Sequence, residues 1–214
     1  MKRKKDPILS QNKILLAAKK EFVKYGFDGA RMDRIADKAK VNKQLIYYYF
    51  KSKDFLFTEV LKESYRQLRA EEEKINIDNM TAYDAMLNLV SVNWNYYIKH
   101  PELIFLLSSE NLMRARHVKD HLSAFLDINK NWEVLTKEII AKGKIDKTIR
   151  EDLDPMQINI SIAALVIFYI TNSSTLSLLY QTDLTSEVEK INRLQSIKDT
   201  IGSWITNKNQ QATI

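Results

Sequence analysis

The chain has 214 residues, enough for one large domain or for a small domain joined to a larger one. Hydrophobic residues make up 45% and charged residues 28%, a balance typical of a globular protein rather than of a disordered one. The absence of cysteine excludes disulfides, thiolate metal sites and cysteine nucleophiles, and four glycines and three prolines are few for the turns of a sandwich or barrel. We therefore expect an all-α fold of about nine helices with short connections.

The net charge of +6 is unevenly distributed along the chain. Residues 1–53 carry 15 Lys/Arg and 5 Asp/Glu, a net charge of +10, whereas the other 161 residues carry −4. A basic head on a mildly acidic body is typical of a module that binds a polyanion, and a basic tail on an unrelated globular protein is the alternative. The basic start, Met1–Lys5, is followed by an amphipathic stretch and not by an apolar run, so we expect a cytoplasmic protein.

The first helix is predicted for the residues before Gly26. Ile14, Ala18 and Phe22 recur every four residues, which is the spacing of one buried helical face. Gly26 and Gly29 then indicate a turn, because glycine commonly ends helices.

Two short helices joined by a tight turn are predicted after this glycine pair. The first of them has one buried face, made of Met32, Ile35, Ala36 and Ala39. Lys40 and Val41 form the turn, and Asn42 is placed to cap the second helix by accepting a hydrogen bond from a free backbone N–H. Ile46 and Phe50 lie four residues apart and face the core. The pattern predicts a helix-turn-helix, whose second helix enters the major groove of DNA.

The outward arc of this recognition helix, about residues 43–49, carries side chains suited to DNA. Lys43 can donate to guanine acceptors or to phosphates, and Gln44 can pair with adenine. Tyr47 and Tyr48 offer hydroxyls to phosphates and ring surfaces to thymine methyl groups. We expect eight residues of this region to contact DNA: Arg31, Lys43, Gln44, Leu45, Tyr47, Tyr48, Tyr49 and Lys53.

The three consecutive tyrosines have a second interpretation, in which they pack a small core. This interpretation fits Tyr49 in part, because Tyr49 lies beside Ile46 on the helical wheel, but Tyr48 lies on the far side and has no core partner there. Ser52 is predicted to cap the next helix, whose N-terminus, together with Lys53, would bind a phosphate.

The rest of the chain is predicted to be helical as well. We expect a DNA-binding domain over residues 1–53, a connecting helix over 54–75, and a second domain over 76–214. Gly143 is expected to close a helix that starts near Val118, and Asp154 with Pro155 is expected to start the next one.

The stretch Met156–Gln181 has no charged residue, and its length alone would allow it to cross a bilayer. Only Ile162–Ile170 is continuously apolar, and the remainder contains many hydroxyl and amide side chains. A lone spanning helix offers these groups no partner. We therefore expect no membrane insertion but a helix buried at a contact between proteins.

Residues Ile14–Leu61 resemble the N-terminal domain of the tetracycline-repressor (TetR) family. The matching marks are Ala17-Ala18, Phe22 and Gly26-Phe27, then Ile35-Ala36, Ala39 and Val41, then Ile46-Tyr47-Tyr48-Tyr49-Phe50, then Lys53-Asp54-Phe55-Leu56. Two positions depart from the family pattern. Lys40 stands where the family usually has glycine, so it is expected to adopt a left-handed turn, and Arg31-Met32 replaces the hydroxyl residues that usually cap the helix.

The resemblance implies that the remainder is a helical domain that binds a small inducer and dimerises through its last two long helices. We expect these helices at about 156–180 and 184–205, forming a four-helix bundle between two subunits. Six apolar residues at helical spacing support the second helix: Val188, Ile191, Leu194, Ile197, Ile201 and Ile205.

Aromatic residues concentrate in this second domain and suggest a cavity for a largely apolar effector. The candidates, with two polar anchors, are Trp94, Tyr97, Phe105, His121, Trp132, Phe168, Tyr169 and Asn172. Ordinary core packing is the alternative for each of them. The expected function is therefore a repressor that leaves a palindromic operator when the effector binds; the alternatives are an activator, or a DNA-binding adaptor without small-molecule sensing.

An enzyme is not expected, and neither is a metal or a cofactor. His117 and His121 form an i, i+4 pair, but two histidines in a basic stretch do not make a metal site. Asp152 and Asp154 precede Pro155 and are interpreted as helix-start residues rather than as a catalytic carboxylate pair.

Overall fold

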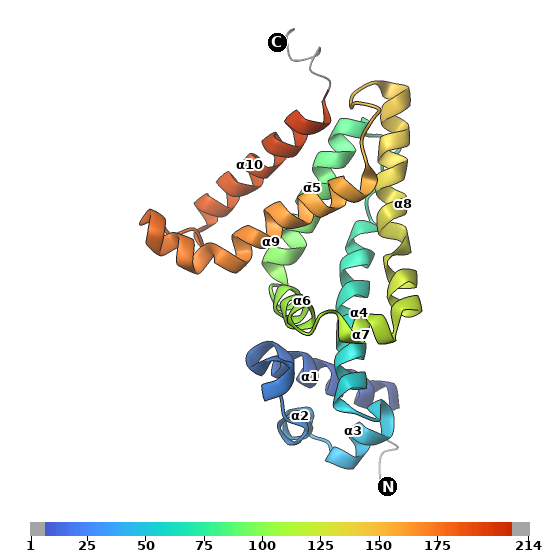
Figure 1. Ribbon diagram of the computed structural model, residues 1–214, viewed down its shortest axis with the longest axis vertical. Helices are drawn as coiled ribbons and strands as arrows, with labels where there is room; N and C mark the ends of the chain where they lie inside the picture. The colour runs from blue at the N-terminus through green and yellow to red at the C-terminus, as the bar shows by residue number, and fades with distance from the viewer. Residues whose placement is uncertain (1–6, 207–214) are drawn as a thin grey trace. The chain divides into compact units, whose positions relative to one another are not determined.

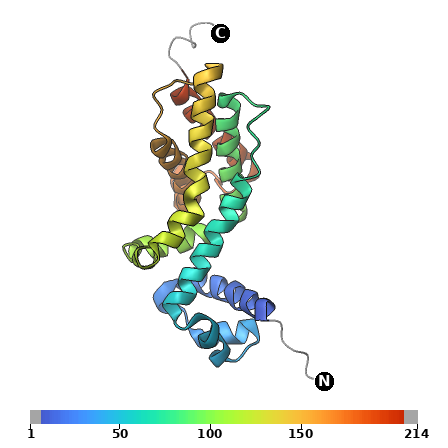
Figure 2. The ribbon, with the colours of Figure 1, turned by 90° about the vertical axis from the view of Figure 1, so that its right-hand side faces the viewer.

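The computed structural model describes residues 7–206, which form ten α-helices and no strand (Figures 1 and 2). The expected all-α class is therefore confirmed for the described residues. The helices are α1 (Pro7–Gly29), α2 (Met32–Ala39), α3 (Lys43–Phe50), α4 (Lys53–Glu72), α5 (Ala82–Lys99), α6 (Glu102–Leu112), α7 (Arg116–Asp120), α8 (Leu122–Asp146), α9 (Pro155–Tyr180) and α10 (Glu187–Ile205).

The described residues divide into two compact units. Among the described residues, the head unit contains residues 7–66 together with Glu102–Ile128, and the body unit contains Gln67–Pro101 and residues 129–206. This division places α6 and α7 with the helix-turn-helix, whereas the sequence ranges 1–53, 54–75 and 76–214 place them with the second domain.

The head unit is built around an aromatic core. Phe22 on α1 and Phe57 on α4 meet edge to face with ring centroids 4.9 Å apart, and Phe27 packs on Phe57 at 5.3 Å. Ile14, Ile35 and Ile46 are fully buried, so α1, α2 and α3 each contribute a residue to one core. Gly26 has a φ of 67°, which bends α1 at the turn that the glycine pair predicts.

The body unit packs α5 against α9 and α10, which fold back on one another as a helical hairpin (Figure 1). Its core comes from all of its long helices, and the fully or nearly fully buried members include Leu68, Met86, Leu89, Val90, Ile139, Ile158, Val166, Ile197, Ile201 and Ile205. Asp154 caps α9 by accepting hydrogen bonds from the backbone of Met156 and Gln157, and Pro155 occupies the first turn as predicted.

The sequence places one helix end wrongly. Gly143 does not close a helix; it lies inside α8, which continues to Asp146, and the segment that starts near Val118 is divided between α7 and α8. A β-carbon on Gly143 would lie 2.2 Å from Cγ1 of Ile149. The glycine therefore permits close packing of the following loop rather than helix termination.

By length and composition, α9 is the one helix among residues 7–206 that could cross a membrane. Several of its polar side chains form hydrogen bonds within the body unit. The Thr136 hydroxyl donates to the buried Asn159 carbonyl at 2.8 Å, and the Tyr169 hydroxyl donates to the backbone of Leu184 at 2.7 Å. These bonds fit a helix of a folded bundle better than a helix in lipid.

Candidate nucleic-acid interface

The turn between α2 and α3 has the geometry of a helix-turn-helix. Lys40 has φ 55° and ψ 44°, in the left-handed region, as its place in the glycine position of the family pattern predicts. The backbone N–H groups of Lys40 and Val41 close the turn on Asp37 and Ala36, at 3.1 and 3.0 Å. A left-handed lysine costs about 1 kcal/mol relative to glycine, so the hydrogen bonds of the turn and the packing around it must offset this cost.

Helix α3 is fixed by its cap and by two core residues. Asn42 adopts an extended backbone, and its side-chain oxygen accepts a hydrogen bond from the Leu45 N–H at 3.1 Å. Ile46 is fully buried and Phe50 nearly so. The predicted cap and the predicted inward face are both confirmed.

The opposite arc of α3 faces solvent. Lys43 and Gln44 are exposed, and the exposed fractions of Tyr47 and Tyr48 are 41% and 69%. Lys43 pairs with Asp33 across the turn at 2.7 Å, and this hydrogen bond raises the pKa of Lys43, so the amine stays charged. An exposed pair of this kind is weak and can be exchanged for a phosphate.

Three of the other four predicted contact residues are partly buried, and the fourth is exposed. Leu45 and Tyr49 are half-buried, and Tyr49 packs edge to face on Tyr48 at 5.2 Å. Arg31 is exposed at the start of α2. Lys53 folds back over the Phe27 ring and donates to the Asp28 carbonyl at 3.1 Å, so it must leave this position to reach a phosphate. The DNA contacts of all eight residues stay predictions.

A buried carboxylate that sequence reasoning missed holds α1 and α2 together. Glu21 on α1 is fully buried and forms ion pairs with Arg34 and with Lys38, the latter at 2.7 Å. Glu21 also accepts a hydrogen bond from the Arg31 backbone N–H at 3.3 Å, at the point where α2 lacks a side-chain cap. Burial raises the pKa of Glu21, but the bonds from Lys38, Arg34 and the Arg31 backbone outweigh burial and lower the pKa below its ordinary value.

A second buried pair, also missed, joins α6 to α7. His117 Nδ1 lies 2.7 Å from a Glu110 oxygen, and the other Glu110 oxygen accepts from the Val118 backbone at 3.0 Å. The His117 ring packs between Phe27 and Phe57, with centroids 5.0 and 4.8 Å away. The pair therefore attaches α6 and α7 to the core of the head unit.

The histidine pair does not form a metal site within the described residues, where no cluster of three or more metal-binding side chains occurs. His117 is bonded to Glu110, and His121 packs on the ring of Phe55 with centroids 6.0 Å apart.

The eight predicted effector residues are divided between the two units, with Phe105 and His121 in the head unit and the other six in the body unit. Trp94, Tyr97 and Tyr169 are buried, whereas Phe105 and Phe168 are exposed at 58% and 59%. The Asn172 side chain donates to the Phe168 carbonyl of its own helix at 2.8 Å. The role of these eight residues in effector binding stays a prediction.

Trp132 borders a small cavity of the body unit. This cavity, of about 210 Å³, also contains Arg69 and Glu72. The Arg69 guanidinium lies 4.4 Å from the Trp132 ring centroid and pairs with Glu72, which also accepts from Asn93 at 3.0 Å. Burial raises the pKa of Glu72 against the opposing charge of Arg69.

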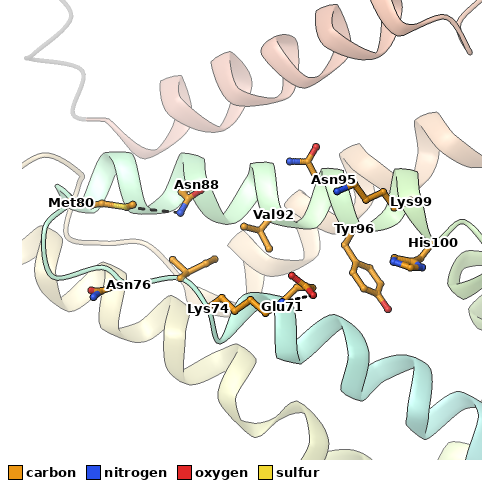
Figure 3. A pocket seen from close by; sticks show the side chains of 11 residues that line it. Glu71, Lys74, Asn76, Met80, Asn88, Val92, Asn95, Tyr96, Lys99 and His100 are labelled. Atoms are coloured by element: carbon orange, nitrogen blue, oxygen red, sulfur yellow. Dashed lines mark hydrogen bonds and ion pairs between the residues drawn. The ribbon is translucent and has the colours of Figure 1, made fainter.

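A larger groove of about 650 Å³ lies in the body unit between the end of α4, the loop that follows and α5 (Figure 3). Its lining is mainly polar: Glu71, Lys74, Ile75, Asn76, Met80, Asn88, Val92, Asn95, Tyr96, Lys99 and His100. Lys74 pairs with Glu71 at 2.6 Å, and this bond lowers the pKa of Glu71 against the effect of burial. None of the eight predicted effector residues lines this groove.

Comparison with known proteins agrees with this geometry. The family model "Bacterial regulatory proteins, tetR family" matches residues 14–60, and the model "Tetracyclin repressor-like, C-terminal domain" matches residues 83–201. The chain belongs to the TetR family of transcriptional regulators. Members of this family bind operator DNA, form dimers and bind small-molecule effectors; they are not enzymes.

Two TetR-family relatives illustrate the match. The HTH-type transcriptional repressor NicS of Pseudomonas putida is 35% identical over 190 residues, 89% of each chain. The HTH-type transcriptional repressor SCO4008 of Streptomyces coelicolor is 38% identical over 109 residues, 50% of this chain and 53% of that protein.

Solved structures share the TetR fold at low identity. A TetR-family regulator from Mesorhizobium loti has a TM-score of 0.68 with 17% identity, covering 95% of this chain and 100% of its own. FadR from Bacillus subtilis, solved in complex with stearoyl-CoA, has a TM-score of 0.65 with 21% identity, covering 91% and 98%.

The Glu21 network gives a test of how the helix-turn-helix is held. We expect Glu21→Gln to lower the free energy of unfolding at pH 7 by about 1–3 kcal/mol, because it removes a buried charge that two cations and a backbone N–H share. The folded-state pKa of Glu21 is depressed below 4.5, so its stabilisation is present above that pH and is lost as the pH falls through the folded-state value. Chemical unfolding between pH 3 and 7 should therefore show the two proteins converging at the acidic end.

Glu133→Gln is the matched control, because Glu133 forms an exposed pair with Lys137. This change should alter the unfolding free energy by less than about 0.5 kcal/mol. A Glu21→Gln protein as stable as the wild type at pH 7 would show that the network does not hold α1 and α2 together.

Proposed function

We propose that the chain is a homodimeric, cytoplasmic repressor that reads a palindromic operator with α3 and releases it when a small molecule binds the body unit. The exposed arc of α3 carries this proposal, because Lys43, Gln44, Tyr47 and Tyr48 face solvent on a helix that is too well anchored to turn inward. A helix with capped N-terminus and outward polar side chains fits the major groove.

The side chains of this arc suggest two kinds of DNA contact, to bases and to phosphates. Gln44 has the amide geometry for bidentate pairing with adenine, and Lys43 suits the acceptors of guanine. Tyr47 and Tyr48 place hydroxyls where phosphates line the groove, so they orient the helix more than they select bases.

Dimerisation is supported by exposed apolar residues on α9 and α10. Met156, Ile160 and Phe168 share one face of α9 and are 52–59% exposed. On α10 the predicted stripe divides: Val188 and Ile191 are exposed, whereas Ile197, Ile201 and Ile205 are buried within the body unit. The proposed dimer contact therefore uses α9 and the N-terminal half of α10, since exposed apolar surface commonly marks a contact between proteins.

Selection of bound duplexes from a random library tests this function most broadly. The full chain should enrich a palindrome, because two symmetry-related heads read two equal half-sites. An enriched sequence without two-fold symmetry, or no enrichment at all, would contradict the proposal.

Within that selection, Gln44→Ala should relax the preference at one base position of each half-site, at a cost of about 1–3 kcal/mol in discrimination. Lys144→Ala is the control, since Lys144 is exposed on α8 of the body unit and lies outside the proposed dimer contact. Unchanged preference in Gln44→Ala would remove Gln44 from base reading.

The groove between α4 and α5 supports the effector part of the proposal. Its volume of about 650 Å³ lies within the range of ligand sites, and its amides and lysines favour a polar effector over the largely apolar one expected from the sequence. Asn95 and Lys99 are exposed on its α5 wall and are available to a ligand (Figure 3).

A bulky substitution that fills the groove tests whether the effector binds there. A small-molecule panel is first screened for compounds that release the wild-type protein from its selected duplex. These compounds should not release Asn95→Trp, because the indole occupies the groove. The affinity of this variant for DNA should be unchanged. Lys137→Trp, on an exposed position of α8 outside both the groove and the proposed dimer contact, is the control and should respond as the wild type does. Equal release of both variants would place the effector elsewhere.

A further inference from the structure

The head unit contains a groove that is lined mainly by lysines. It has a volume of about 590 Å³ and lies between α1 and the C-terminal end of α2. Four lysines and three apolar residues line it: Lys13, Leu16, Ala17, Lys20, Lys38, Ala39 and Lys40. No acidic residue is among them.

Three of these lysines are unpaired. The side chains of Lys13, Lys20 and Lys40 are exposed and make no hydrogen bond or ion pair with the described residues. Lys38 is the exception, because its amine forms an ion pair with the buried Glu21 carboxylate at 2.7 Å. Elsewhere on α1, Lys19 is neutralised by Glu102 at 2.9 Å, so the groove lysines differ from their neighbours.

Four cations around one groove repel one another, and a single buried carboxylate shared with Arg34 does not compensate them. An anion bound in the groove would relieve the repulsion. A groove lined by one sign of charge also concentrates counter-ions of the opposite sign.

The place of the groove in the helix-turn-helix indicates which anion it meets. In this motif the first helix crosses the DNA backbone while the second enters the major groove. Here the first helix is α2, and Lys40 lies two residues before the Asn42 cap of α3. The C-terminal end of α2, with the groove beside it, therefore lies near the N-terminus of the recognition helix.

We propose that this lysine groove binds the sugar-phosphate backbone of DNA flanking the bases that α3 reads. The proposal rests on the proposed operator binding and extends it from the tip of α3 to the side of α1. Lys13 and Lys20 supply contacts from α1, and Lys40 supplies one from the turn.

An acidic segment of another protein is a less suitable occupant. Leu16, 58% exposed, is the one large apolar side chain in the lining, and Ala17 and Ala39 add little area. Protein partners rely on buried apolar anchors at the centre of the contact, whereas a phosphate backbone requires mainly cations.

The salt dependence of binding tests the proposal. The probe is the duplex that the wild-type chain selects, measured by fluorescence anisotropy between 50 and 300 mM salt. Each lost phosphate contact lowers the slope of log affinity against log salt by about 0.9. Since Lys13→Gln/Lys20→Gln removes two contacts from each head of the dimer, it should lower the slope by about 3.6 with an unchanged base preference.

Lys130→Gln/Lys144→Gln is the matched control, because it removes the same charge from exposed positions of α8 in the body unit. It should keep the wild-type slope. Thermal unfolding of each variant checks that the surface changes leave the fold intact.

Duplex length gives a second readout. Extending the selected palindrome by several base pairs on each side should strengthen wild-type binding more than binding by the groove variant. Equal slopes and equal gains from the flanks in all three proteins would overturn the proposal, and an acidic protein partner would then be the better explanation of the groove. Failure of the wild type to bind any duplex would instead overturn the proposed function itself.

Discussion

The short length of α3 is the constraint on which the rest of the head unit depends. Eight residues are too few for a helix to persist in water by its own propensity. Three features outside the helix therefore hold it: the Asn42 cap, the left-handed Lys40, and the core into which Ile46 and Phe50 insert. Since all of the fixing interactions lie at one end and on one face, the other face is left for DNA.

The features that sequence predicts well are those set by neighbours along the chain. Apolar spacing locates α2 and α3, an asparagine before a periodic run locates the cap, and a lysine at the usual glycine position predicts the left-handed turn. Each depends on residues fewer than five apart, so the pattern is visible without coordinates. For the second domain, local apolar spacing predicts helices but not how they pack. The resemblance to the TetR family supplies the expected packing of its last two helices.

The features that sequence misses depend on residues far apart. Glu21 looks like a surface residue of α1 until Arg34 and Lys38, more than ten residues later, surround it. Gly143 looks like a helix terminator until Ile149 and Ala82, the latter from the start of α5, pack against it. The large groove illustrates the same limit, because composition does not show that the tertiary structure brings amides and lysines from α4, the following loop and α5 together.

Chemical protection of the selected palindrome measures the central claim directly, namely that the outward face of α3 lies in the major groove. Dimethyl sulfate methylates guanine N7 in the major groove and adenine N3 in the minor groove. With the full chain bound, the account predicts protection of guanine N7 in both half-sites while adenine N3 there stays reactive. Protection of adenine N3 with fully reactive guanine N7 would contradict it.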